Sequence, residues 1–127
     1  MKFLKQIVIA LAVALSVGSF SQVMAAGKIE NATPEEVGAA IASAAKNSED
    51  ALAALKNGEA DETVLELIEA ARQDSKRIEV GRLDVKRTRA AAHLKNARSA
   101  IRKGDKTKAE ASLIEAVKGY QEVKAEY

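Results

Sequence analysis

The chain has 127 residues, of which 30% are charged, with a formal net charge of +2, no cysteine and one histidine. The lack of cysteine excludes a disulfide framework and thiol chemistry, and a single histidine cannot supply the converging ligands of a histidine-rich metal site. Aromatic residues make up only 3% of the chain, so any core must be built mainly from Ala, Leu, Ile and Val.

Residues 1–25 are typical of a secretory signal peptide. Lys2 and Lys5 precede an apolar run over residues 7–17, and Val23-Met24-Ala25 is a small-x-small cleavage site. The apolar run is shorter than the ~20 residues that a membrane anchor requires. We therefore expect export to the periplasm, with cleavage near Ala25.

The remaining chain is formally neutral, because the two lysines of the signal peptide account for the surplus charge. Its charges are unevenly placed. Residues 28–71 carry three basic and ten acidic side chains, residues 72–108 carry thirteen basic and four acidic ones, and the rest carry two and four. Residues 26–32 show no periodicity and are expected to form a flexible arm.

The first helix is expected to begin at Thr33-Pro34-Glu35-Glu36. Thr33 is a suitable N-cap, Pro34 fits the first helical position, and the two glutamates favour the positive end of the helix dipole. Asn57-Gly58 should end this helix. Its buried stripe follows a three- and four-residue spacing: Val37, Ile41, Ala44, Ser48, Ala51 or Leu52, and Leu55.

Three further helices follow the same pattern. The second begins near Asp61, and a turn over residues 79–84 leads to the third, with Asp84 as its expected cap. A continuous helix through Gly81 is the alternative, since one glycine costs only about 1 kcal/mol within a helix; it would favour a homodimer over a monomer. Lys103-Gly104-Asp105 then separates the third helix from the fourth. The stripes of these helices are Val64, Leu67, Ile68, Ala71, Ser75 and Ile78; Leu83, Ala90, Leu94, Ala97 and Ile101; and Ala109, Leu113, Ala116, Val117, Tyr120 and Val123.

An internal repeat fixes the unit of structure. Residues 44–72 align without a gap with residues 90–118, displaced by 46, so that Gly58 corresponds to Gly104 and Asn47 to His93. Each copy predicts an αα-hairpin, over about 33–80 and 83–127. The predicted fold is an all-α, up-down-up-down four-helix bundle built from two repeated hairpins, spanning residues 33–127.

The candidate metal ligands are mostly carboxylates. Glu59, Asp61, Glu62, Glu66 and Glu69 form the densest acidic patch, and the first four are the candidate ligands for hard cations such as Ca²⁺ or Mg²⁺. The alternative is a solvated helix face that complements the dipole. His93 is the one imidazole, either a further ligand or an ordinary residue at the border of the core. A divalent cation is the only cofactor that these residues suggest, and the sequence holds no catalytic triad or other enzyme site.

The basic run of the third helix is the candidate partner surface. Arg89, Arg98 and Arg102 represent it, and it suits an acidic envelope protein or anionic lipid headgroups. Nucleic acid is not expected, because export and the lack of interleaved aromatic residues argue against it. The alternative is that this helix faces the acidic first and second helices inside the bundle.

The repeat resembles the small metal-binding protein (SmbP) family of exported bacterial four-helix bundles. The matching features are Ala45-Lys46, Glu49-Asp50-Ala51-Leu52, Lys56, Gly58, Asp61 and Leu65-Glu66 in the first copy, and His93-Leu94, Ala97, Gly104, Glu115-Ala116 and Val117 in the second. The resemblance implies the fold and a periplasmic location. That family binds divalent metals through many surface histidines, of which only His93 has a counterpart here, while Asn47, Ala54 and Glu59 lie near positions where others would be expected.

The sequence thus predicts an exported, non-catalytic helical-bundle binding protein. The first hypothesis is weak divalent-cation binding through carboxylates. The second is an envelope interaction module that uses the basic surface of the third helix, and the third is a structural spacer or dimer.

Overall fold

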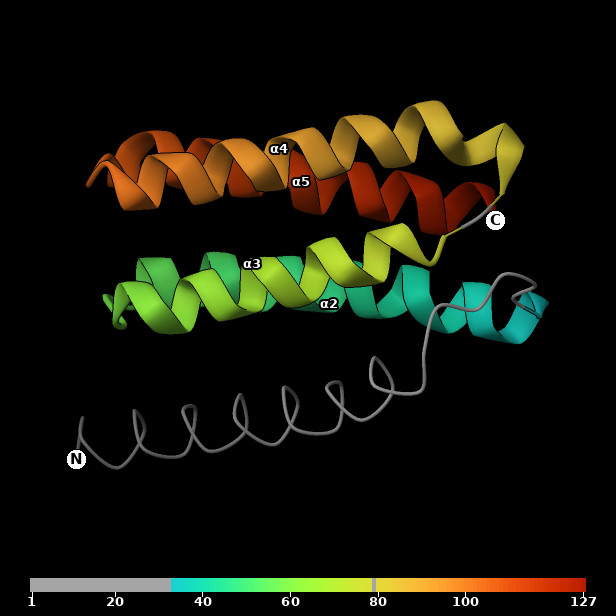
Figure 1. Ribbon diagram of the computed structural model, residues 1–127, viewed down its shortest axis with the longest axis horizontal. Coiled ribbons are helices and arrows are strands. Elements are labelled where there is room, and N and C mark those ends of the chain that lie inside the picture. The colour runs from blue at the N-terminus through green and yellow to red at the C-terminus, as the bar shows by residue number, and fades with distance from the viewer. Residues whose placement is uncertain (1–32, 79) are drawn as a thin grey trace.

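The computed structural model describes residues 33–78 and 80–127, so the predicted signal peptide and arm lie outside the described residues. The described chain forms α2 (Pro34–Lys56), α3 (Asp61–Lys76), the short 3₁₀ helix η1 (Gly81–Leu83), α4 (Asp84–Arg102) and α5 (Lys106–Glu126). Successive long helices run in opposite directions (Figure 1). The predicted up-down-up-down four-helix bundle is confirmed.

The start of α2 has the expected capping geometry. The Thr33 hydroxyl accepts a hydrogen bond from the Glu36 backbone N–H at 3.2 Å, and the Glu36 carboxylate accepts one from the Thr33 N–H, also at 3.2 Å. Pro34 takes the first helical position. This reciprocal capping box satisfies two backbone donors that the first turn would otherwise leave unpaired.

The two hairpin turns each depend on one glycine. Gly58 has φ of 72° and Gly104 has φ of 77°, a left-handed conformation that other residues adopt only at a steric cost. In the second turn, Asp105 also caps α5, because its carboxylate accepts a hydrogen bond from the Lys108 N–H at 3.1 Å. The two copies of the repeat therefore turn in the same way.

The link between the hairpins breaks the helix, as the turn over residues 79–84 predicted. Helix α3 ends at Lys76, and η1 occupies Gly81–Leu83 before α4 begins. The alternative of one continuous helix is wrong. The expected cap is also wrong, because Asp84 is the first residue of α4 and its carboxylate accepts instead from the Arg87 guanidinium at 3.2 Å.

Most of the buried core residues belong to the predicted stripes, but five alanines outside them are buried as well: Ala40, Ala45, Ala54, Ala70 and Ala100. Leu52, Leu55 and Val117 were predicted to be buried and are only partly so. Alanine supplies many of the buried positions, which lets the helices approach closely. Helix α2 packs on α3, α4 on α5 and α2 on α5, whereas α3 and α4 form the sparsest of the four neighbouring pairs. No helix within the described ranges is both long and apolar enough to cross a membrane.

The α2–α5 seam holds the hairpins together at several points. The Tyr127 hydroxyl donates to the Pro34 carbonyl at 2.6 Å, and the Gln121 amide donates to the Glu49 carboxylate at 2.9 Å. Across the α3–α4 seam, the described residues form only longer contacts: the Arg87 guanidinium donates to the Ser75 carbonyl at 3.4 Å, and the Arg98 guanidinium lies 3.8 Å from the Glu69 carboxylate. That seam is therefore the more open side of the bundle.

Candidate functional site

The predicted acidic patch lies at the first hairpin turn and the start of α3. Asp61, Glu62 and Glu66 are exposed, and Glu59 is half-buried in the turn. Asp61 and Glu62 occupy the first turn of α3, where negative charge is favoured by the dipole. No three His, Asp or Glu side chains of residues 33–78 and 80–127 come together as a group that could hold a metal ion.

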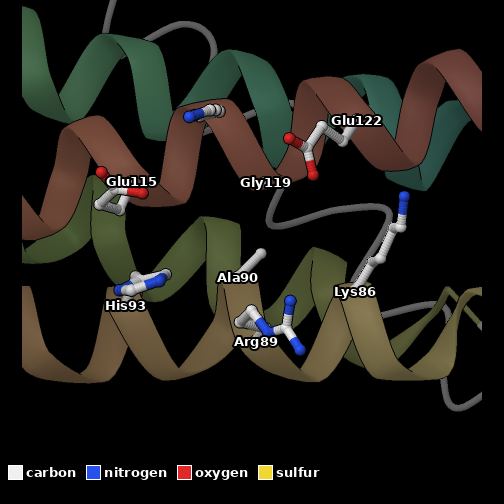
Figure 2. A pocket seen from close by; sticks show the side chains of 8 residues that line it. Lys86, Arg89, Ala90, His93, Glu115, Gly119 and Glu122 are labelled. Carbon is white, nitrogen blue, oxygen red and sulfur yellow. The ribbon is translucent and has the colours of Figure 1, made fainter.

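His93 lies apart from these acids, in the other hairpin. It lines a cavity of about 170 Å³ between α4 and α5, together with side chains of both signs (Figure 2). Beneath the cavity the two helices nearly touch: a Cβ placed on Gly119 would lie 2.8 Å from the Ala90 Cβ. The structure thus places His93 opposite Glu115 of α5, and does not bring it to the carboxylates with which it was grouped. The lining residues are Lys86, Arg89, Ala90, His93, Glu115, Lys118, Gly119 and Glu122.

The three predicted partner-binding arginines do not share one surface. Arg89 lines the α4–α5 cavity, whereas the Arg98 guanidinium lies 3.8 Å from the Glu69 carboxylate of α3. Nine residues separate them, which is half a turn out of phase on a helix of 3.6 residues per turn. Arg102 is exposed at the end of α4. The basic run therefore divides into an α5-facing side and an α3-facing side.

The α3-facing side borders a groove that the sequence analysis did not identify. The groove has a volume of about 270 Å³ and lies between α3 and α4, where the helix packing is sparsest. Among the described residues, its lining holds four cationic side chains and no acidic one. Ala91 and Ala92 supply apolar surface between the charges. The full lining is Arg72, Ser75, Lys76, Arg87, Thr88, Ala91, Ala92 and Lys95.

The four cations of the groove differ in how they are held. The Arg72 guanidinium contacts the Glu69 carboxylate at 2.8 Å. Arg87 donates to the Asp84 carboxylate at 3.2 Å and to the Ser75 carbonyl at 3.4 Å. Lys76 and Lys95 form no ion pair with an acidic side chain of the described residues. The groove thus has two guanidinium groups held by carboxylates and two ammonium groups that have no ion-pair partner among the described residues.

Glu69 marks one end of the groove. Although partial burial acts to raise its pKa, hydrogen bonds from Gln73 and Arg72 and the positive charges of Arg72 and Arg98 hold the pKa of this carboxyl below its usual value. Arg98–Glu69 is the one ion pair between the two hairpins among the described residues. Of the ion pairs expected between basic α4 and the acidic helices α2 and α3, this is the only one that the described residues form.

Behind the groove lies a buried polar cluster. Asp74 is completely buried, and one of its carboxylate oxygens accepts a hydrogen bond from the Asn47 amide at 2.9 Å. Its other oxygen, the Ser75 hydroxyl and the Tyr120 hydroxyl have no hydrogen-bond partner among residues 33–78 and 80–127. Burial raises the pKa of Asp74 to about 7, against the lowering effects of Asn47, Ser43 and Arg77, and raises the pKa of Tyr120 to about 12.

A signal for the groove is present in the sequence. Arg87, Ala91, Lys95 and Arg98 recur at spacings of four, four and three, which places them on one side of a helix. Arg72 and Lys76 form a matching four-residue pair at the end of the preceding helix. Sorting the basic residues by helical face rather than by sequence would have separated these cations from Arg89.

Comparison of the chain with known protein families, with characterised proteins and with solved structures gave no match.

Proposed function

We propose that the protein is a non-catalytic binding module that holds an acidic partner in the α3–α4 groove. The observation that carries this proposal is the composition of the groove, which combines four cations, no acid and an apolar floor. Like charges gathered at a recess raise the local concentration of oppositely charged ligands. The predicted signal peptide would bring this surface to the cell envelope.

An acidic protein segment fits the groove better than a lipid surface does. The cations converge on a recess between two helices, and a narrow chain can enter it. A bilayer would first meet the outward side of α4, where the Val85 side chain is exposed, and not the recess. The favoured partner is therefore a segment of an acidic protein rather than anionic lipid headgroups.

Binding of poly-L-glutamate to the purified protein tests this proposal. The variant Lys76→Glu/Lys95→Glu reverses the charge of the two lysines, and we expect its affinity to fall about tenfold or more, since several exposed charge pairs of 0.2–1 kcal/mol each change from attraction to repulsion. The matched control is Lys106→Glu/Lys108→Glu. It changes the net charge equally but lies at the start of α5, outside the groove, where acidic residues suit the helix dipole.

The outcomes separate the two partner classes. Loss of poly-L-glutamate binding in the groove variant, with the control unaffected, supports the proposal. Equal losses in both variants would show that only overall charge matters. Binding confined to phosphatidylglycerol vesicles would assign the basic surface to lipid headgroups instead.

Weak divalent-cation binding through Glu59, Asp61, Glu62 and Glu66 stays a prediction, and thermal melts with Ca²⁺, Mn²⁺, Ni²⁺, Cu²⁺ or Zn²⁺ test it. An ion that binds only the folded state should add about 2.7 kcal/mol of stability at 100 times its dissociation constant. The variant Asp61→Asn/Glu62→Gln/Glu66→Gln should abolish such a shift and leave poly-L-glutamate binding no weaker. Equal shifts in the wild type and this variant would contradict the assignment to these carboxylates.

A further inference from the structure

The α3–α4 groove has a shape and a charge pattern that define the form of its occupant. Resting on the function proposed above, we infer that the groove receives an acidic amphipathic α-helix of a partner protein, which packs lengthwise between α3 and α4 as an additional helix of the bundle. Three features of the groove support this: the spacing of its cations, the small apolar residues Ala91 and Ala92 that form its floor, and the ion pairs that its arginines already make.

The spacing of the cations matches one side of a helix. Arg87 and Lys95 are eight residues apart on α4, which corresponds to about 12 Å at a rise of 1.5 Å per residue. Arg72 and Lys76 are one turn apart on α3, or about 6 Å. A helix laid along the groove and carrying carboxylates at positions i, i+4 and i+8 repeats these distances. Its acids would meet cations along both edges.

The floor of the groove suits a close helix–helix contact. Ala91 and Ala92 of α4 carry the smallest apolar side chains, so the backbone of an incoming helix can approach to the 8–10 Å axial distance of packed helices. A fully charged chain would leave this apolar surface uncovered. An amphipathic helix covers it with small apolar side chains and keeps its acids at the rim.

The groove does not have the features that other modes of peptide recognition require. The described residues form no β-sheet whose edge could accept a strand, and the groove has no aromatic side chain against which a polyproline segment could pack. Phosphate recognition favours free guanidinium groups that bind in a bidentate manner. Both arginines of the groove already contact carboxylates, and its other two cations are lysines. The ammonium groups of these lysines can instead pair with single carboxylates spaced along a helix.

Three synthetic peptides test the inference against the purified protein. The first has Glu at i, i+4 and i+8 beside an Ala/Leu stripe over about four helical turns. The second has the same composition in an order that destroys the stripe, and the third carries a central proline that breaks the helix. We expect the first peptide to bind at least tenfold more tightly than the other two and to gain helical circular dichroism on binding.

Variants of the protein locate the site. Lys76→Glu/Lys95→Glu should weaken binding of the first peptide about tenfold, whereas Lys106→Glu/Lys108→Glu should change it less than threefold. The neutral pair Lys76→Gln/Lys95→Gln guards against a fold defect, since it keeps long helix-forming side chains and should give an intermediate loss.

A further substitution probes the floor. Ala92→Glu should abolish the preference for the amphipathic peptide over its scrambled form. Equal affinity for all three peptides, lost in the groove variant, would overturn the helical occupant and leave the proposed acidic partner intact. No binding of any acidic peptide or of poly-L-glutamate would overturn both. Binding of the first peptide that Ala92→Glu and the groove variant leave unchanged would place the helix elsewhere.

Discussion

The first hairpin, α2–α3, and the second, α4–α5, place different side chains at corresponding positions. Asn47 and Asp74 form a buried hydrogen-bonded pair in the first hairpin. The positions displaced by 46 hold His93, which is half-buried at a cavity, and Tyr120, which is completely buried. A carboxylate in one core thus corresponds to an aromatic ring in the other.

This difference shows which features the duplicated scaffold requires. Both hairpins keep a left-handed glycine at the turn and an Ala- and Leu-rich stripe, because the backbone path and the packing depend on them. Outside these shared positions, the two hairpins differ in where they carry polar and charged groups. The first hairpin has a polar group inside its core, and the second has a set of cations on its surface. Two of these, Arg87 and Lys95, line the groove together with Arg72 and Lys76 at the end of α3.

The largest predicted effect concerns the buried carboxyl. The pKa of Asp74 in the folded protein is about 7, above its ordinary value of 3.8. Between these values the folded state keeps a proton that the unfolded state has lost. The contribution of Asp74 to stability is therefore greatest below pH 4, and it is lost as the pH rises through 7, by up to about 4 kcal/mol for a pKa difference of this size.

Asp74→Asn removes this titration and keeps the shape of the side chain. Denaturant unfolding measured from pH 4 to pH 8 should lose its downward slope, and the variant should be more stable than the wild type at pH 8. The control Asp50→Asn changes an acid outside the core and should keep the wild-type slope. A slope that persists in Asp74→Asn would mean that another group causes it.

The second prediction exchanges a core residue of one hairpin for its counterpart in the other. Ser48 of α2 is buried, and its hydroxyl donates to the Ala44 carbonyl at 2.7 Å. Its counterpart in α4, Leu94, is completely buried in the apolar core of the bundle. Leu94→Ser should cost about 3 kcal/mol of unfolding free energy, because it removes apolar burial and leaves a cavity.

Ile114→Ser is the surface control for this substitution. Ile114 is 44% exposed on α5, so its loss should change the unfolding free energy by about 0.5 kcal/mol or less. If chemical denaturation gave similar losses of unfolding free energy for the two variants, Leu94 would not be packed in the core as the structure places it.

The sequence predicted the fold because apolar residues recur with one period in each helix and the repeat fixed the unit. Gly58, Gly104 and the capping box at Thr33 were also readable, since each local conformation has a preferred residue. The functions of polar residues depend instead on neighbours distant in sequence. The sequence spacing of Asn47 and Asp74 does not predict that α2 and α3 bring these two side chains into contact.

The candidate site was predicted less well for the same reason. The basic run was found, but its residues were grouped by sequence, so Arg89 and Arg98 were assigned to one surface although they lie half a turn apart. Lys76 and Arg72 belong to the preceding helix and were not grouped with the basic run. The groove arises from the sparse α3–α4 packing, which periodicity within a single helix cannot reveal.

The third prediction compares one helical glycine in each hairpin. A Cβ on Gly119 of α5 would lie 2.8 Å from the Ala90 Cβ, whereas a Cβ on Gly38 of α2 would lie 3.4 Å from the Tyr127 ring. Gly119→Ala should therefore destabilise the protein by about 1 to 2 kcal/mol through overpacking. Gly38→Ala should stabilise it by up to about 1 kcal/mol through helix propensity. Thermal melts with opposite signs would support the close α4–α5 contact, and shifts of the same sign would contradict it.

The smallest effect concerns the N-termini of α2 and α4, the first helix of each hairpin. Helix α2 begins with a complete capping box, whereas α4 has no side-chain cap, because Leu83 occupies the capping position. Thr33→Ala should cost about 1 kcal/mol. Asp84→Ala should cost less, about 0.5 kcal/mol, because it removes only an exposed contact with Arg87 and one favourable charge at the helix start. Since the cap orders the first turn of α2, hydrogen exchange should quicken there in Thr33→Ala and leave α4 unchanged. Equal costs for the two variants would mean that the α4 start is held by its side chain after all.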